Sequence, residues 1–149
     1  MKIGEICTRE VVCTAADTPV AAAAKLMRQY HIGDVIVTQN NDRKRTPLGI
    51  VTDRDIVLGV VAPELAPNTI TVGDIMGQEL ITAGEDEDVF DVVQRMRSNG
   101  VRRMPIVDAD GALAGIVSID DILEVLAEAM TELARLISRE QLHEQQTRR

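Results

Sequence analysis

An internal repeat constrains the fold of this chain more than any other feature of its sequence. At a shift of 69 residues, Ile3–Ile6 falls on Val72–Ile75 and Met27–Arg28 falls on Met96–Arg97. The shift becomes 66 after a longer loop in the first copy, where Leu48–Ile56 falls on Ala114–Ile122. Two copies of one unit therefore make up most of the chain. We place the boundaries as follows: copy one at 1–62, a proline-containing linker at 63–71, copy two at 72–128, and a C-terminal extension at 129–149.

Each copy is predicted to hold a helix, two short strands and a second helix. The first helix is expected to begin at Asp17–Pro19 in copy one and near Glu85 in copy two, where Gly100 is placed to end it. Compact apolar runs predict strands at 35–37, 48–51, 104–107 and 113–117, with turns at Thr46–Pro47 and Asp110–Gly111. The second helix of copy one is expected over about Asp53–Ala62. This order predicts two similar units in which helices and short buried strands are mixed.

The last helix is predicted to run from about Asp120 to beyond Leu136. Its apolar residues recur every three or four positions along one face: Ile122, Leu126, Met130, Leu133 and Ile137. Such a stripe needs a partner, and two readings stay open: the helix packs on its own unit, or it extends outward and dimerises. The polar stretch 141–149 is expected to fray.

Composition excludes several classes of function. The chain has 149 residues and a net charge of −8, which argues against duplex nucleic-acid binding, and its single Tyr and single Phe argue against base stacking. No signal peptide and no apolar run of membrane-spanning length stand out, so we expect a cytoplasmic protein without membrane contact. Cys7 and Cys13 lack the spacing of a zinc or redox motif, and we interpret them as buried thiols.

The side chains best suited to bind a ligand lie at the junction between the second strand and the second helix of each copy. Thr52 is followed by Asp55, and Ser118 by Asp121. The simpler interpretation is a capping box, in which the hydroxyl and the carboxylate satisfy free backbone amides at a helix start. The alternative is a nucleotide site, in which the hydroxyl contacts a phosphate and the carboxylate accepts hydrogen bonds from two ribose hydroxyls.

Both copies resemble CBS domains, the modules named after cystathionine beta-synthase, and together they resemble a tandem Bateman module. The resemblance covers about residues 2–128 and rests on the repeat, on the GIVTDRD and GIVSIDD segments, on GVRRMPIVD and on VGDIM. It implies an α/β fold of small sheets flanked by helices, in which the two units pack with approximate twofold symmetry. It also implies nucleotide sites in the clefts between them. It also implies a homodimer.

The resemblance implies two sites for an adenosine nucleotide. Thr52 with Asp55 and Ser118 with Asp121 would contact phosphate and ribose. Adenine would be held mainly by backbone of 13–15 and 32–35 in copy one and of 82–84 and 101–104 in copy two, stretches that contain Thr14, Ala15, Gly33, Val35, Ala83 and Met104.

Positive charge is unequal between the copies. Arg102 and Arg103 of copy two align with Gly33 and Asp34 of copy one, and Arg54 stands beside Thr52 where copy two has Asp120. Guanidinium groups suit phosphate oxygens, so these arginines are candidate ligands, with solvated surface as the alternative. His31 is a weaker candidate, because a histidine there can equally cap the helix.

No catalytic constellation is present: the chain has no recognisable Ser/His/Asp set and no phosphate-binding Walker loop. We expect a non-catalytic regulatory protein, without metal or covalent cofactor, that binds AMP, ADP, ATP, NAD or S-adenosylmethionine and signals to a partner protein. The alternative is a dimerising interaction module without a physiological nucleotide, in which both capping boxes serve only the helices.

Overall fold

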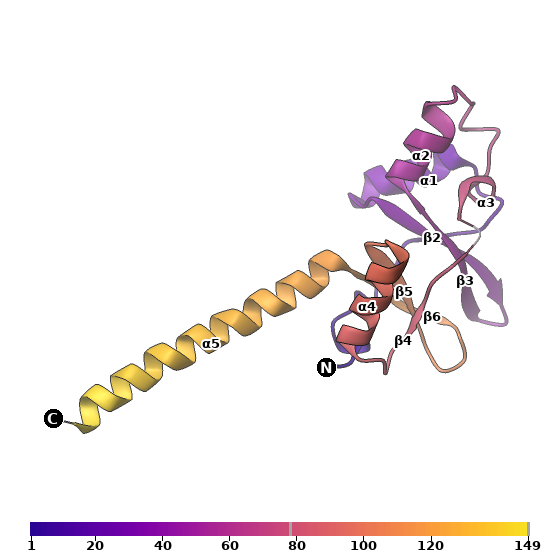
Figure 1. The fold of residues 1–149 in the computed structure, drawn as a ribbon. Coiled ribbons are helices and arrows are strands. Elements are labelled where there is room, and N and C mark those ends of the chain that lie inside the picture. Colours follow the sequence, from indigo (N-terminus) through magenta and orange to yellow (C-terminus); the bar gives the residue numbers. More distant parts are fainter. Residues whose placement is uncertain (78, 149) are drawn as a thin grey trace.

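Two small sheets form the body of the protein, and one long helix projects from it (Figure 1). The computed structural model describes residues 1–77 and 79–148. Each sheet has three strands: β1 (Cys13–Thr14), β2 (Asp34–Asn41) and β3 (Lys44–Thr52) in the first, β4 (Ala83–Gly84), β5 (Arg103–Val107) and β6 (Leu113–Ser118) in the second. In both sheets the first strand runs parallel to the second, which pairs antiparallel with the third. The α/β fold of two equivalent units is therefore confirmed.

The helices follow the same repeat. They are η1 (Ile3–Glu5), α1 (Val20–Tyr30), α2 (Asp53–Ile56) continued by the π-helical turn η2 (Val57–Val61), α3 (Val72–Ile75), α4 (Val89–Asn99) and α5 (Ile119–Thr147). The start expected at Asp17–Pro19 is slightly early: α1 begins at Val20, and Pro19 occupies its N-cap position without a side-chain cap. The start expected near Glu85 is also early: Asp88 accepts a hydrogen bond from the backbone of Phe90 and begins α4.

The two hairpins turn in different ways. The turn predicted at Thr46–Pro47 lies inside β3, and the chain reverses instead at Asp42 and Arg43, which have positive φ angles of 44° and 68°. Pro47 fits the strand because it pairs with Thr38 beside a register shift, where the missing N–H of proline is tolerated. The predicted turn at Asp110–Gly111 is confirmed, with Gly111 at φ 80°.

Each repeat has its own apolar core, but each core is completed by the other repeat. Ile3 and Ile6 pack with Val92, Met104 and other copy-two residues, whereas Val72, Ile75 and Met76 pack in the core of copy one. We call residues 3–7 and 72–76 the lead segments. Their backbone bonds agree: Ile3 N donates to Glu87 O at 2.8 Å, and Val72 N donates to Thr18 O at 2.8 Å. The two repeats thus exchange their lead segments.

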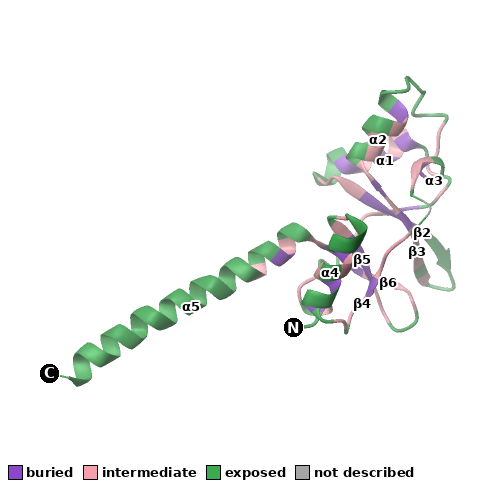
Figure 2. Ribbon diagram, in the orientation of Figure 1, coloured by how far each residue is buried: buried purple, intermediate pink, exposed green. Residues whose placement is uncertain are grey.

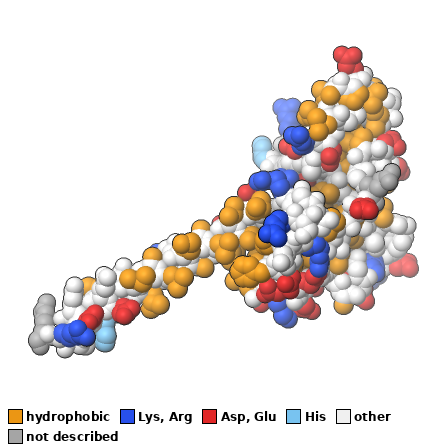
Figure 3. All heavy atoms as spheres, in the orientation of Figure 1, with side chains coloured by type: hydrophobic (Ala, Val, Ile, Leu, Met, Phe, Trp, Pro, Cys, Tyr) orange, Lys and Arg blue, Asp and Glu red, His pale blue; other side chains and the backbone are white. Residues whose placement is uncertain are grey.

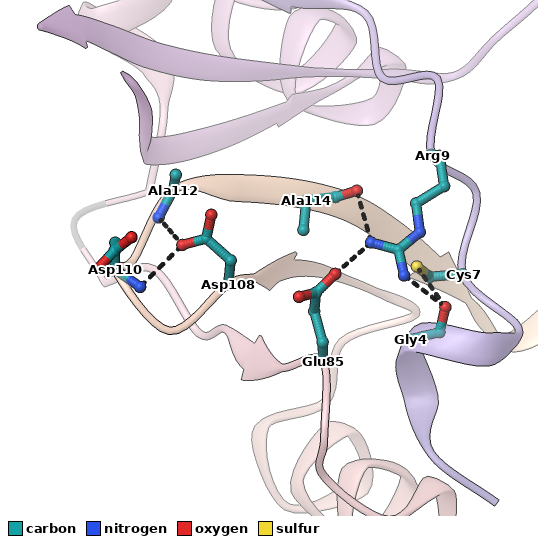
Figure 4. Close-up of polar contacts among 8 residues, drawn as sticks. All are labelled: Gly4, Cys7, Arg9, Glu85, Asp108, Asp110, Ala112 and Ala114. Atoms are coloured by element: carbon teal, nitrogen blue, oxygen red, sulfur yellow. Dashed lines mark hydrogen bonds and ion pairs between the residues drawn. The ribbon is translucent and has the colours of Figure 1, made fainter. Parts of the chain in front are cut away.

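The N-terminal lead segment is held on copy two by Arg9 (Figure 4). The Arg9 guanidinium donates to Gly4 O at 2.8 Å and to Ala114 O at 3.3 Å, and it pairs with the carboxylate of Glu85. Figure 4 also shows Asp108, whose Oδ1 accepts from the amides of Asp110 and Ala112 and so stabilises the β5–β6 turn. One guanidinium therefore links three segments of the exchanged structure.

Each lead segment contains a glycine, Gly4 or Gly73, at a point where backbone of another segment comes very close. A Cβ on Gly4 would lie 2.9 Å from Glu85 O, and a Cβ on Gly73 would lie 2.8 Å from Ala16 O. Glu85 and Ala16 are themselves equivalent positions of the repeat. Because backbone atoms cannot move aside as a flexible side chain can, the exchange requires a residue without Cβ at both positions.

Helix α5 leaves the body and stays exposed along most of its length (Figure 2). Ile122 is buried in the copy-two core, but every described residue from Leu126 onward is exposed. Packing of the whole stripe on its own unit is therefore wrong; only the first turn packs there. The predicted fraying of 141–149 is wrong as far as Thr147, because the helix continues to that residue. No helix among the described residues is both long and apolar enough to cross a membrane.

Candidate functional site

Two clefts lie between the repeats, and each combines a strand-to-helix junction of one repeat with the helix-to-strand segment of the other. The Thr52 cleft has a volume of about 460 Å³ and is lined by Ile50, Thr52, Asp53, Arg54, Asp55, Gly100, Val101, Arg102 and Arg103. The Ser118 cleft has a volume of about 320 Å³ and is lined by Thr8, Glu10, Val11, Val12, His31, Ile32, Gly33, Asp34, Arg103, Ile116, Ser118, Asp120 and Asp121. Both volumes are in the range of small-molecule sites.

The capping boxes are formed at both junctions. Asp55 N donates to Thr52 Oγ1 at 3.1 Å while Thr52 N donates to Asp55 Oδ2 at 2.8 Å. The second box repeats this geometry, with 3.2 Å from Asp121 N to Ser118 Oγ and 2.9 Å from Ser118 N to Asp121 Oδ2. Within residues 1–77 and 79–148, Oδ1 of Asp55 and of Asp121 accepts no hydrogen bond. Each carboxylate therefore caps its helix and keeps acceptor capacity for a ligand.

A third capping box lies outside both clefts. Asp74 N donates to Thr71 Oγ1 at 3.3 Å, and Thr71 N donates to Asp74 Oδ2 at 3.0 Å, at the start of α3. The hydrogen bonds that the Asp74 carboxylate receives from Thr71 hold its pKa below the usual range. The same local motif therefore caps α3 away from both clefts, which makes Asp74 a reference for the other two.

The two clefts differ in charge. Three arginines and two aspartates line the Thr52 cleft. The Ser118 cleft carries Glu10, Asp34, Asp120 and Asp121 against Arg103 and His31. Anions are therefore favoured in the Thr52 cleft and disfavoured in the Ser118 cleft.

Arg103 lies between the clefts and lines both of them. Its Nε is 3.1 Å from Asp34 Oδ1, and the two side chains are 33% and 16% exposed. Burial raises the pKa of Asp34 above its usual range, and the Arg103 guanidinium counters part of that shift. The Arg103 guanidinium therefore pairs with an internal carboxylate while it also lines both clefts.

Most of the candidate residues predicted from the sequence are brought together by this arrangement, although not within one copy. Thr52, Arg54 and Asp55 of copy one share a cleft with Arg102 and Arg103 of copy two. Likewise, His31 and Gly33 of copy one share a cleft with Ser118 and Asp121 of copy two. The capping box of one repeat therefore faces the segment that joins the first helix to the second strand in the other repeat.

Five predicted contact residues do not line either cleft. Val35 and Met104 have 0% exposed surface and Ala83 has 1%, because all three lie within the cores. Ala15 is exposed but outside both clefts, and Thr14 is buried. The Thr14 Oγ1 atom is buried without a hydrogen-bond partner among the described residues. Val35, Met104 and Ala83 belong to strands of the two cores, and contact of these five residues with adenine stays a prediction.

Sequence reasoning missed the apolar wall of the Ser118 cleft. Val11 and Val12 line it, and they come just before the stretch 13–15 that was predicted to contact adenine. Two adjacent valines ahead of a two-residue strand are the signal that was available. The ion pair between Asp34 and Arg103 was also missed, because nothing local links positions so far apart in the chain.

His31 joins α1 to β2 in a left-handed conformation, with φ 55° and ψ 45°. Its equivalent in copy two is Gly100, with φ 64°. The backbone N–H of His31 donates to Met27 O, a bond that any residue except proline can make, so a capping role of the imidazole itself stays a prediction. This conformation places His31 on the rim of the Ser118 cleft.

Comparison with known families agrees with this architecture. The profile of the CBS domain matches residues 3–61 and again residues 72–128. The chain belongs to the CBS domain family. An uncharacterised protein of Methanopyrus kandleri is 38% identical over 125 residues, which are 84% of this chain and 62% of that protein. The chain therefore spans less than two thirds of this relative.

Solved structures show the same CBS pair. Hypoxic Response Protein I, crystallised with two coordinated zinc ions, is 30% identical with a TM-score of 0.73, covering 83% of this chain and 98% of that one. The CBS domain pair of protein MJ0100, in complex with 5'-methylthioadenosine and S-adenosyl-L-methionine, is 24% identical with a TM-score of 0.73, covering 87% of this chain and 98% of that one. In the described part of the present chain, no group of three or more His, Cys, Asp or Glu residues is placed to hold a metal ion.

Proposed function

We propose that this CBS pair is a non-catalytic regulatory module that binds adenosine-containing ligands in its two clefts, with phosphate-bearing nucleotides in the Thr52 cleft. The observation that carries the proposal is the meeting of Arg54, Arg102 and Arg103 with the Thr52–Asp55 box. The arginines supply positive charge for AMP, ADP, ATP or NAD phosphates, and Thr52 adds a hydroxyl donor. Asp55 Oδ1 accepts from the ribose hydroxyls.

The Ser118 cleft is suited to a ligand that carries positive charge or no charge. Its four carboxylates repel a polyphosphate and attract a cation, so an adenosine derivative without phosphate, such as S-adenosylmethionine, fits it better. The complex of MJ0100 with adenosine derivatives that lack phosphate supports this ligand class. Val11 and Val12 offer an apolar wall for adenine, and Asp121 Oδ1 accepts from the ribose.

Binding is proposed to act on a partner protein through a homodimer in the cytoplasm. A ligand changes such an assembly only if it binds one of two states more tightly. The alternative is a dimerising interaction module without a physiological nucleotide, and the formed capping boxes are the observation in its favour, because they explain Thr52, Asp55, Ser118 and Asp121 without a ligand.

Calorimetric titration with AMP, ATP and S-adenosylmethionine separates these alternatives when three alanine variants are compared. Asp55→Ala, Asp121→Ala and Asp74→Ala each remove one capping box, and each is expected to cost about 1 kcal/mol of stability. Under the nucleotide proposal, Asp55→Ala loses ATP binding, Asp121→Ala loses S-adenosylmethionine binding, and Asp74→Ala keeps both. A wild-type chain that is folded and binds none of these ligands would instead establish the interaction module.

A further inference from the structure

Among the described residues, Arg103 is the one that both clefts share, and its guanidinium lies at the wall between them. Its Nε is 3.1 Å from Oδ1 of Asp34, which lines the Ser118 cleft and not the Thr52 cleft. A Cβ built on Gly33 would lie 3.5 Å from Nη2 of Arg103 and 3.2 Å from Oδ2 of Asp53, which lines the Thr52 cleft. The guanidinium therefore lies between a carboxylate of one cleft and a carboxylate of the other.

The strand register explains how the ion pair comes to join the two capping boxes. Asp34 is paired with Thr52 in the first sheet, and Arg103 is paired with Ser118 in the second. Each of the two residues starts beside the box of its own repeat, and its side chain reaches the other repeat. Figure 3 shows basic and acidic side chains close together where the two units meet. A change in this one ion pair therefore acts on both clefts.

The Ser118 cleft depends on Arg103 for positive charge. Arg103 is the only Lys or Arg among the described residues that line it, whereas Glu10, Asp34, Asp120 and Asp121 are acidic. A guanidinium carries a single positive charge, so a phosphate in the Thr52 cleft competes with Asp34 for it. Once Arg103 turns to the phosphate, the charge of Asp34 is left uncompensated in the Ser118 cleft.

We infer that Arg103 couples the two clefts through Asp34, so that a phosphate-bearing nucleotide in the Thr52 cleft strengthens the binding of a cationic adenosine derivative in the Ser118 cleft. The phosphate draws the guanidinium away from Asp34, and the uncovered carboxylate attracts the cation. The effect is reciprocal, because a cation beside Asp34 frees Arg103 for the phosphate. The inference deepens the proposed function and rests on it.

Calorimetric titration of S-adenosylmethionine into the wild-type protein, with and without saturating ATP, tests the coupling. ATP is expected to strengthen S-adenosylmethionine binding about fivefold, and S-adenosylmethionine is expected to strengthen ATP binding by the same factor. S-adenosylhomocysteine is the matched control ligand, because it has a neutral thioether in place of the sulfonium cation. Its affinity is expected to be the same with and without ATP.

Two arginine variants separate the coupling from simple phosphate binding. Arg102→Gln and Arg103→Gln each remove one guanidinium from the Thr52 cleft, and both are expected to weaken ATP binding. Arg102 does not line the Ser118 cleft, so Arg102→Gln is expected to keep the ratio of S-adenosylmethionine affinities with and without ATP. Arg103→Gln is expected to bind S-adenosylmethionine more tightly than the wild type already without ATP, and to lose the coupling.

Asp34→Asn removes the coupling from the other side of the ion pair. Arg103 is then free without any ligand, so ATP binding is expected to become tighter and to respond no longer to S-adenosylmethionine. Melting curves without ligand check that all three variants are folded. The comparison of S-adenosylmethionine with S-adenosylhomocysteine uses the wild type alone and does not depend on these variants.

The remaining outcomes all count against the coupling, and they separate it from the proposed function. A wild-type chain that binds both ligands independently, or that binds one more weakly in the presence of the other, overturns the coupling while ligand binding stands. A chain that binds neither ligand overturns both. Equal strengthening of S-adenosylhomocysteine by ATP, or full coupling in Arg103→Gln, would show that the clefts communicate without this ion pair and would also overturn the inference.

Discussion

Asp34 and Arg103 occupy equivalent positions of the two repeats, and they form an ion pair with each other across the molecule, with 3.1 Å between Oδ1 and Nε. A residue that meets its own counterpart lies close to the approximate twofold axis. Two carboxylates or two guanidinium groups would repel one another there. The divergence of this position into Asp and Arg therefore removes a clash of like charge and makes the two clefts unequal.

Asp34→Asn is expected to strengthen ATP binding in the Thr52 cleft about tenfold, or about 1.4 kcal/mol, because it releases Arg103 for the phosphates. The free energy of unfolding is expected to change by less than about 1 kcal/mol, since the pair is partly exposed and its carboxylate is already disfavoured by burial. Calorimetry with ATP and with adenosine measures the effect. A gain for adenosine equal to that for ATP would contradict the role of Arg103.

Gly73→Ala is expected to lower the free energy of unfolding by about 1–3 kcal/mol, because the new Cβ meets the carbonyl of Ala16. Helix propensity alone predicts that alanine would raise the free energy of unfolding instead, since Gly73 lies in α3. Gly77→Ala is the control, because a Cβ there meets nothing within 4 Å. Urea denaturation compares the two, and equal effects would argue against close packing of the lead segment.

Glu87→Gln is expected to reduce the dependence of stability on acidic pH. Hydrogen bonds from Arg95 lower the pKa of Glu87, and its Oε2 also accepts from Gly84 N at 2.6 Å. A carboxyl with a lowered folded-state pKa stabilises the protein above its unfolded value of 4.5, and that contribution is lost as pH falls through the folded pKa. Melting temperatures of variant and wild type are therefore expected to differ at pH 7 and to converge as pH falls below the lowered folded-state pKa of Glu87. A difference that persists in acid would contradict this assignment.

His31→Gly is expected to raise the free energy of unfolding by up to about 1 kcal/mol. The left-handed conformation costs a non-glycine residue about 1–2 kcal/mol, and the greater chain entropy of glycine offsets about 0.5–1 kcal/mol of that. Gly100→Ala in the equivalent position is expected to change stability in the opposite direction. Chemical denaturation measures both, and a destabilised His31→Gly would show that the imidazole makes a stabilising contact.

Local sequence predicted the elements and the capping boxes because their causes are local. Thr52 with Asp55 and Ser118 with Asp121 form hydrogen bonds over three residues, and the repeat showed that both units share one fold. The exchange of lead segments could not be predicted. Ile3 and Val72 are both aliphatic and introduce the same pattern, so either segment could complete either core.

The composition of the clefts was also beyond local reasoning. Which loop faces the Thr52 box depends on how one repeat is rotated against the other, and only the folded chain brings Arg102 to it. The stripe of α5 was predicted, but Ile122 belongs to the core and Leu123 takes its place on the exposed face. Ile122 and Leu123 are adjacent in the chain, and the spacing of apolar residues alone did not show which of them faces the core.

Because the lead segments are exchanged, one sequence repeat does not correspond to one folding unit. One repeat is a continuous stretch of sequence, whereas one core takes residues from both repeats. A chain cut between residues 62 and 72 would give two fragments, each carrying the segment that completes the other. A single repeat of this design would have to fold as an intertwined pair of molecules, and two copies joined in one chain make that association intramolecular.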